Sequence, residues 1–280
     1  MKTEKDIWQA GDLTGNENEG QSVQTGANEE ARVVHVLWTG GLASTARIVE
    51  LSRMEVTVQP YYIVDFGWKP TLYEESAMQK IREHVFKGSR TLAKIQPVKE
   101  IFLEEVKPCP QITNAWKALH DRYRVDRRYE FLARYAKQHG TVLELCVGKG
   151  EESVQNSIRN ESKMIPFTGP MGESFRISEA DSTEAAKTLY ENFTFPLWEK
   201  DMRAEVRMME RYGCGDIAAM TWFCHTPLLG EPCGHCAPCR SARRYGFLWQ
   251  PPVSRTILWG ILHPEQAGKI ILRKTLGRTS

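Results

Sequence analysis

The chain has 280 residues, of which 41% are hydrophobic and 26% charged, and its formal net charge is +2. This composition is ordinary for a globular protein, and the length suffices for one large domain or for a domain with a small added module. No run approaches the roughly 18 apolar residues of a membrane-spanning helix. The first residues also lack the basic-then-apolar pattern of a secretion signal. These features disfavour membrane and secreted proteins, so we expect a cytoplasmic protein.

The two ends of the chain differ in charge. Residues 1–31 hold seven acidic residues against Lys2 and Lys5, and their large apolar residues are few. Such a segment cannot offset its own ordering entropy, which predicts a disordered extension before a fold that begins at Val33. After Cys239, eight Lys and Arg residues stand against Glu265. This basic end is either a solvated tail or a surface that attracts anions or nucleic acid.

The patterns from Val33 onward alternate between strand and helix. They predict, in chain order, a strand at 33–38, a helix at 44–54, a strand at 56–65, a helix at 73–86, a strand at 98–103, a long helical region at 114–138, a strand at 141–147, a polar loop at 148–168, and helices at 182–193 and 200–212. Pro60 should bend or bulge its strand, and the long helical region, broken near Val125, should end at Gly140. Residues 257–262 and 270–272 fit either late strands or packing segments. Alternating elements predict an α/β fold, a doubly wound parallel sheet with helices on both faces.

The first strand runs into a loop with two adjacent glycines. Gly40 and Gly41 let backbone N–H groups turn inward, and the following helix N-terminus attracts anions. Hydroxyl groups of Thr39, Ser44 and Thr45 could bind phosphate oxygens. A plain strand-to-helix turn with a Ser or Thr cap explains the same residues. As a phosphate-binding loop, the segment would use Trp38, Thr39, Gly40, Gly41, Leu42, Ser44 and Thr45.

Four of the seven cysteines fall within 16 residues, as Cys224, Cys233, Cys236 and Cys239. Two-residue spacings let neighbouring thiolates chelate one tetrahedral ion, and a shell of four thiolates leaves no position open for water. This pattern predicts a structural zinc ion. Disulfides or a redox pair are the competing interpretations, although a cytoplasmic protein disfavours disulfides.

Two histidines and three further cysteines lie near or outside this segment. His225 and His235 could each replace one of the four cysteines as a ligand. Cys109, Cys146 and Cys214 are isolated, which predicts small buried apolar side chains and not nucleophiles.

The glycine loop resembles the SGGxDS signature of the PP-loop ATP pyrophosphatases, which cleave ATP to AMP and pyrophosphate. Thr39, Gly40, Gly41, Ser44 and Thr45 follow that signature, and Ala43 stands where the family usually has Asp. Together with the cysteine segment, the loop resembles the 7-cyano-7-deazaguanine synthases of queuosine biosynthesis. The further similarities are in 221–224, 233–240 and 246–247 around the cysteines, 195–197 with 200–213, the arginine-bearing stretch 125–131, and the turn 65–67 after the second strand.

The resemblance implies a fold, cofactors and site residues. The fold would be that of the adenine nucleotide alpha hydrolases, with residues 32–212 as the nucleotide-binding domain and 213–280 as a zinc-binding module with a basic tail. ATP with Mg²⁺ would bind at the glycine loop and at Asp65. Lys149, Arg127, Arg128 and Arg159 are the candidates to stabilise negative charge during catalysis, and each could equally be a solvated surface residue.

The implied reaction activates a carboxylate. The carboxylate of 7-carboxy-7-deazaguanine attacks the α-phosphate of ATP, and an amine nitrogen then displaces AMP to form an amide. In the family a second ATP converts that amide to the nitrile. The acceptor would be ammonia or, as is expected of family members in anti-phage operons, a protein amine.

Two departures from the family leave the function open. The family's substrate loop is replaced by Ser153 to Asn160, in which Arg159 alone matches, and Ala43 weakens the loop signature. Three functions therefore stand: a nitrile-forming synthase, a paralogue with another acceptor, and a module that binds ATP or a nucleobase without turnover. A homodimer is compatible with each of them.

Overall fold

The structure is a computed structural model that describes residues 33–65, 70–86, 90–149, 152–169, 171–247, 252–265 and 267–268. The predicted disordered extension at 1–31 and the segment 270–272 lie outside these residues. The first described element, strand β1, begins at Val33, as the apolar pattern predicted. None of the described helices combines the length and the apolar character that crossing a bilayer requires.

Six strands of the described chain form one sheet, and every pairing in it is parallel. They are β1 (Val33–Leu37), β2 (Thr57–Val64), β3 (Lys94–Ile95), β4 (Lys99–Phe102), β5 (Leu143–Glu144) and β8 (Phe193–Thr194). The order is β3-β2-β1-β5-β8, and β4 pairs with β2 further along that strand. The chain thus leaves β1 on one side toward β2 and later returns to its other side as β5. The strand order reverses between β1 and β5, which is where ligands bind in open α/β sheets.

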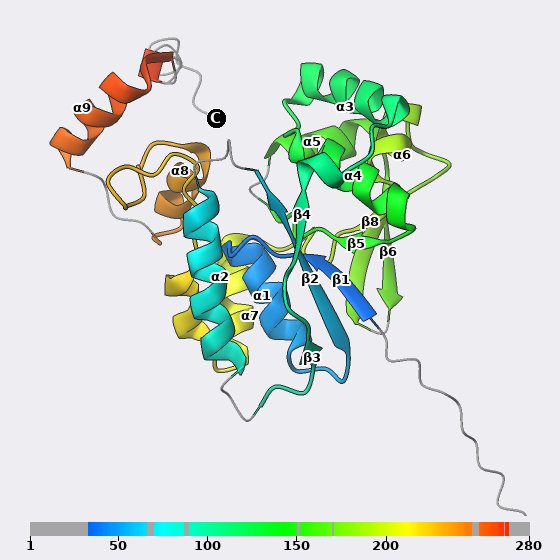
Figure 1. The fold of residues 1–280 in the computed structure, drawn as a ribbon, viewed down its shortest axis with the longest axis horizontal. Helices are drawn as coiled ribbons and strands as arrows, with labels where there is room; N and C mark the ends of the chain where they lie inside the picture. Colours follow the sequence, from blue (N-terminus) through cyan, green and yellow to red (C-terminus); the bar gives the residue numbers. More distant parts are fainter. Residues whose placement is uncertain are drawn as a thin grey trace, which may run out of the picture. The chain divides into compact units, whose positions relative to one another are not determined.

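Helices cover both faces of this sheet (Figure 1). Helices α1 (Leu42–Leu51), α2 (Thr71–Phe86) and α7 (Met202–Arg211) pack on one face, and α3 (Pro110–Tyr123), α4 (Arg128–His139), α5 (Glu152–Glu161) and α6 (Glu184–Tyr190) pack on the other. Strand residues alternate between the two cores: Tyr62 of β2 joins the α1 side, and Tyr61 and Ile63 join the α3 side. The predicted α/β architecture with a parallel sheet is confirmed.

The remaining described elements follow or flank this sheet. Strands β6 (Met164–Gly169) and β7 (Gly172–Ile177) form an antiparallel hairpin. Two 3-10 helices, η1 (Leu103–Glu105) and η2 (Gly215–Met220), and two α-helices, α8 (Ala237–Arg244) and α9 (Val253–Leu262), complete them. Ile217 of η2 packs in the same core as α1, so that core extends past the predicted domain boundary at residue 212.

Pro60 does not bulge its strand. The pairing of β1 with β2 runs without a break in register from Val33 opposite Thr57 to Leu37 opposite Tyr61. The interruption falls in the neighbouring strand, because β3 ends at Ile95 and β4 begins at Lys99. Pro60 lacks an N–H group to donate, and it lies between the β2 residues that pair with β3 and those that pair with β4. The predicted bulge is therefore wrong, and the missing donor is accommodated by a gap in the partner strand.

Two further sequence predictions require correction, and one open alternative is decided. The polar stretch 148–168 is not a loop, because it contains helix α5 and strand β6. Of the two alternatives for residues 257–262, the strand is excluded, because these residues belong to helix α9. The strand expected at 141–147 pairs as a strand only over Leu143–Glu144. The break in the long helical region is confirmed, since α3 ends at Tyr123 and α4 begins at Arg128, and Gly140 caps α4 with a φ of 60°.

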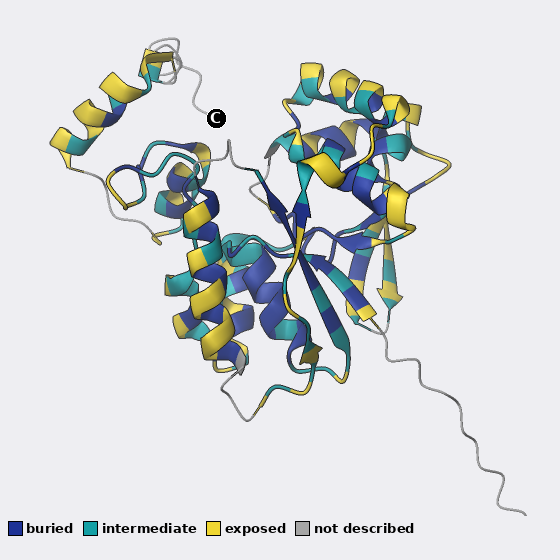
Figure 2. Ribbon diagram, in the orientation of Figure 1, coloured by how far each residue is buried: buried dark blue, intermediate teal, exposed yellow. Residues whose placement is uncertain are grey.

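Helix α9 packs on the cysteine segment through Trp259. Trp259 is 2% exposed and lies against the buried cysteines, whereas Val253, Ile257 and Ile261 are exposed (Figure 2). The helix is thus held at the indole ring, and the rest of its apolar side faces outward.

Candidate functional site

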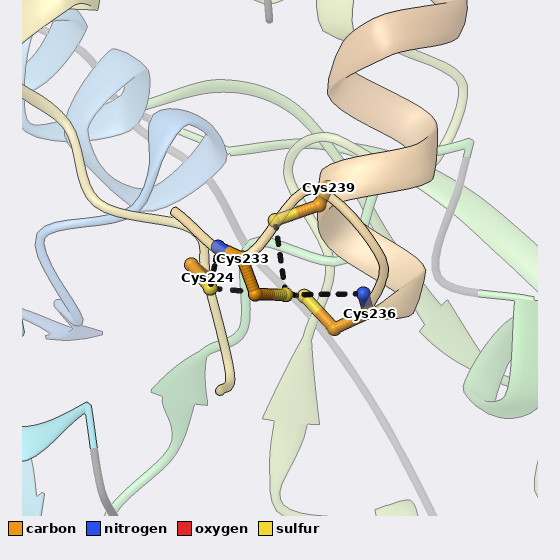
Figure 3. A group of neighbouring side chains, drawn as sticks. All are labelled: Cys224, Cys233, Cys236 and Cys239. Carbon is orange, nitrogen blue, oxygen red and sulfur yellow. Dashed lines mark hydrogen bonds between the residues drawn. The ribbon is translucent and has the colours of Figure 1, made fainter. Parts of the chain in front are cut away.

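The four cysteines predicted as zinc ligands meet in one buried cluster (Figure 3). Cys224 and Cys233 lie in the loop before α8, Cys236 caps this helix and Cys239 lies in its first turn. Their sulfur atoms all lie within 4.8 Å of one another, with 3.8 Å between Cys233 and Cys239 and 4.0 Å between Cys224 and Cys236. A tetrahedral zinc with bonds of about 2.3 Å separates its sulfur ligands by about 3.8 Å. The cluster therefore has the composition and size of a four-thiolate zinc site.

Backbone geometry places donors around these sulfur atoms. The amide groups of His235 and Cys236 donate to the Cys233 sulfur at 3.3 Å, and the Cys233 amide donates to the Cys224 sulfur at 3.1 Å. Gly234, with a φ of 79°, makes the turn that directs the amides of His235 and Cys236 toward the sulfur atom. Such donors stabilise thiolate charge, and thiolates are the form that binds zinc.

The four thiols compete for protons. Hydrogen bonds from its neighbours, foremost Cys224, hold the pKa of Cys233 below its ordinary range. Hydrogen bonds to the same neighbours, again foremost Cys224, raise the pKa of Cys239. Four thiolates at this separation repel one another unless a cation lies between them. A divalent ion removes that conflict, so the donor set favours a metal over four free thiols.

The geometry supports neither disulfides nor histidine ligands in this segment. All seven cysteines lie in the described residues, and none of them forms a disulfide. His225 and His235 are outside the ligand cluster. The His235 ring stacks on Trp259 with centroids 4.7 Å apart. Burial, and then the charge of Arg128, lower the pKa of His225 to about 4, so it is neutral at physiological pH.

The glycine loop lies at the carboxyl end of β1, beside the reversal of strand order. Gly40 has a φ of 66°, and a Cβ atom there would lie 2.8 Å from the carbonyl oxygen of Glu74. This position accepts glycine alone, because both the backbone angle and the approach of α2 exclude a side chain. Gly41 caps α1 with ordinary angles, and its carbonyl accepts the first helical hydrogen bond from Thr45.

The three hydroxyl groups of the loop differ in exposure. Thr45 is fully buried, and its hydroxyl accepts a hydrogen bond from the Trp38 indole at 3.2 Å. The Ser44 hydroxyl, in a residue 6% exposed, bonds within the loop to the Thr39 amide and the Gly41 carbonyl. Trp38 and Thr45 therefore stabilise the loop from the core side. The partly exposed loop residues, which a ligand can reach, are Thr39, Gly41, Leu42 and Ala43.

Trp222 joins the cysteine cluster to the glycine loop. Its backbone N–H donates to the Gly40 carbonyl at 2.9 Å, and its indole N–H donates to the Cys224 carbonyl at 2.9 Å. Its ring stacks on Tyr73 at 4.5 Å between centroids. The two sequence motifs, about 180 residues apart in the chain, are thus adjacent in the fold.

Glu74 borders the loop with its backbone carbonyl and carries a buried carboxylate. Glu74 is 7% exposed and accepts a hydrogen bond from the Tyr62 hydroxyl at 2.7 Å. Burial by itself would lower the pKa of Arg128. The nearby carboxylates of Asp126 and Glu74 outweigh this effect, so the pKa of Arg128 is raised. Arg128 also bonds Asp126 through its amide and its Nε, at 2.9 and 3.1 Å. The sequence prediction omitted Glu74, because an acid in the first turn of a helix is an ordinary feature.

The other predicted site residues lie in separate surroundings. Lys149 follows β5 and its Nζ lies 3.0 Å from a carboxylate oxygen of Glu199. The Arg127 guanidinium is exposed, 3.3 Å from Glu130 and over the Phe131 ring. Arg159 stacks over the ring of Trp198. The carbonyl of Asp65 accepts a hydrogen bond from Thr71, and the adjoining turn at 66–67 lies outside the described residues.

No protein-family model and no curated protein matches the chain. Four sulfur ligands suit a closed, structural metal site, because no coordination position is left for water or substrate. The glycine loop offers backbone amides and a helix N-terminus, which suit an anion.

A hollow of about 430 Å³ lies elsewhere, between the first residues of β1 and the β6–β7 hairpin. Its two charged lining residues, Arg47 and Glu144, bind each other at 2.7 and 2.8 Å. Because that pair is already complete, we place the candidate site at the glycine loop and not in this hollow.

Proposed function

We propose that the chain binds ATP at the loop from Thr39 to Thr45 and uses it to activate the carboxylate of a 7-deazaguanine. The observation that carries the proposal is the position of the loop. It follows the central strand β1 at the reversal of strand order, and it is hydrogen-bonded to a segment that holds four clustered cysteines. This pairing of motifs matches the resemblance to the 7-cyano-7-deazaguanine synthases.

The proposed chemistry needs positioning and charge neutralisation from the protein. A carboxylate oxygen attacks the α-phosphorus, the bond to the bridging oxygen breaks, and pyrophosphate leaves. An amine nitrogen then attacks the acyl carbon and AMP leaves, which gives an amide. Backbone amides of the loop would bind phosphate oxygens, and Arg128 would neutralise the developing charge. Mg²⁺, held with ATP at the glycine loop and Asp65, would neutralise phosphate charge.

The metal in this proposal is a zinc ion that stabilises the fold. Cys224, Cys233, Cys236 and Cys239 would hold it with the geometry described above. A closed shell of four thiolates supplies no Lewis-acid position, so the ion would act on the fold and not on the reaction.

The proposal is tested by product analysis. The full-length chain is incubated with ATP, Mg²⁺, 7-carboxy-7-deazaguanine and ammonia, then pyrophosphate release and product mass are measured. We expect about one pyrophosphate per deazaguanine consumed and an amide-type product, because Ala43 and the altered stretch 153–160 weaken the second activation. A ratio near two with the free nitrile would make the chain an ordinary synthase. Absence of pyrophosphate release with every amine offered would overturn the ligase proposal.

A variant separates nucleotide binding from folding. Gly41 has ordinary backbone angles, so Gly41→Val does not force a left-handed conformation. Its Cβ atom would lie 3.3 Å from the Thr39 hydroxyl and 3.5 Å from the Trp222 carbonyl, so the added bulk lies within the loop. We expect this variant to lose ATP binding in calorimetry while it retains zinc. Unchanged ATP affinity would show that the loop is only a strand-to-helix turn.

One observation favours a second candidate, a module that binds ATP or a nucleobase without turnover. Ala43 stands where the resembled signature has an acid. If the acid matters for turnover, Ala43→Asp should raise the rate of pyrophosphate release. ATP binding without any pyrophosphate release in either form would favour the binding module.

A further inference from the structure

Trp222 is the described residue that packs against both the α1-side core and the cysteine cluster. Its indole N–H holds the carbonyl of Cys224, which is itself a member of the cluster. Its backbone N–H holds the carbonyl of Gly40. A shift of the Cys224 backbone therefore reaches the glycine loop through one residue, Trp222, whose indole bonds Cys224 and whose backbone bonds Gly40.

The opposite side of the loop is fixed. The Glu74 carbonyl oxygen, in the first turn of α2, lies 2.8 Å from where a Cβ atom of Gly40 would be, and Tyr73 of the same turn stacks on Trp222. Gly40 is thus held between α2 and Trp222. Since α2 packs on the sheet through Met78 and Ile81, Trp222 is the part of this clamp that depends on the cysteine segment.

We propose that Trp222 is a positioning residue through which a metal ion in the cysteine cluster fixes the glycine loop. The ion would hold the Cys224 sulfur, and hydrogen bonds around ligand residues transmit that constraint to their neighbours. The loop is then ordered when the metal is bound and loosened when it is removed. The nucleotide part of this inference rests on the proposed function, because it assumes that ATP binds at this loop.

The coupling has a thermodynamic consequence. If zinc orders the loop that binds ATP, then ATP raises the affinity for zinc by the same factor by which zinc raises the affinity for ATP. This reciprocity distinguishes coupling from two sites that merely share one fold.

The test measures hydrogen exchange in the full-length chain. The exchange rates measured are those of the Thr45 amide, which donates to the Gly41 carbonyl, and the Trp222 amide, which donates to the Gly40 carbonyl. Amides of β1 report global folding. The forms compared are the zinc-loaded protein, the protein after chelation, and the zinc-loaded variants Trp222→Phe and Trp222→Ala. Trp222→Phe keeps an aromatic ring against Tyr73 and removes only the bond to Cys224.

A matched control removes the same kind of bond elsewhere. The indole N–H of Trp116 donates to the Val125 carbonyl at 3.1 Å, on the other face of the sheet. Trp116→Phe should leave the exchange of the loop amides dependent on zinc, as in the unaltered chain.

We expect exchange at Thr45 and Trp222 to rise about fivefold to tenfold on chelation, which is the size of one lost hydrogen bond. Both Trp222 variants should show this fast exchange with zinc still bound, while β1 stays protected. Slow loop exchange in zinc-loaded Trp222→Ala would overturn the proposal. Hydrogen exchange in the zinc-loaded variants also tests the proposal if chelation unfolds the whole chain, because the variants keep their metal.

A second arm measures zinc affinity against a competing chelator, with and without ATP. ATP should tighten zinc binding in the unaltered chain and in Trp116→Phe, and not in Trp222→Phe. If ATP fails to bind at all, the proposed function fails while the exchange result still stands. If ATP binds but leaves zinc affinity unchanged, the coupling is wrong and the proposed function stands.

Discussion

At the residue scale, a buried ion pair joins α1 to β5. Arg47 is 1% exposed, and its guanidinium binds Glu144 at two points and Glu50 at 2.6 Å. Charges removed from water are stable only while they remain paired and hydrogen-bonded. The pair thus fixes the position of α1 relative to β5, the strand that neighbours β1.

We expect Arg47→Met to lower the free energy of unfolding by about 3 to 5 kcal/mol, because it leaves the Glu144 carboxylate buried without its partner. Denaturant titration of the full chain measures this loss. The double variant Arg47→Met with Glu144→Leu should recover most of the stability. A double variant as unstable as the single one would show that shape, and not charge, dominates at this position.

A second residue-scale prediction concerns pH. Burial alone would raise the pKa of Asp126, but the charge of Arg128 and its hydrogen bonds outweigh this. The pKa of Asp126 therefore lies below its ordinary 3.8 in the folded chain. A carboxyl group whose pKa is lower in the folded chain than in the unfolded chain stabilises the fold at pH values above its unfolded-state pKa. This stabilisation is lost as the pH falls through the folded-state pKa.

Comparison with Asp126→Asn isolates this contribution. We expect the unaltered chain to be the more stable form at pH 5 to 7, and the difference to shrink below about pH 4. The difference should be small, because the Asp126 side chain is 41% exposed and solvent screens it. Denaturant titrations at pH 3, 5 and 7 measure it, and a difference that grows in acid would contradict the sign.

At the element scale, glycines at two helix positions give opposite predictions. Gly140 caps α4 with a φ of 60°, and a Cβ atom there would meet nothing within 4 Å. Gly140→Ala should therefore lower stability by about 1 to 2 kcal/mol through the backbone alone. Gly260 lies inside α9, and a Cβ atom there would meet only Ala267, at 3.9 Å.

Gly260→Ala serves as the matched substitution. It should raise the stability of α9 by about 0.5 to 1 kcal/mol, because alanine loses less backbone entropy in a helix. Thermal unfolding of the two variants measures both effects. Equal shifts in one direction would show that the cap angle at Gly140 is not what determines its cost.

At the scale of the whole molecule, the cysteine cluster should link metal binding to folding. Cys236→Ser removes one of four ligands, and we expect it to lose the bound zinc and several kcal/mol of stability, because metal binding in such sites is also folding free energy. Elemental analysis and thermal unfolding measure the two effects. Cys109→Ser alters a cysteine outside the cluster and should retain one zinc per chain. A purified chain that carries neither zinc nor iron would remove the basis of this prediction.

Local patterns in the sequence determined the elements and the two motifs. Apolar spacing predicted β1, β2, α2 and the pair α3 and α4, since a period of two or 3.6 residues is a property of a short segment. The spacing of Cys233, Cys236 and Cys239 likewise predicted the cluster, because chelation by residues three apart needs only a local turn.

Tertiary structure alone decided the rest. Helix α5 buries Gln155 and Ser157, and these polar residues become acceptable there only because the Trp198 carbonyl and the Tyr190 hydroxyl bind them. The contact of Trp222 with Gly40 and the place of Glu74 beside the loop depend on the order of the strands. No local pattern encodes them, because each contact joins segments whose distance along the chain is unrelated to their distance in space.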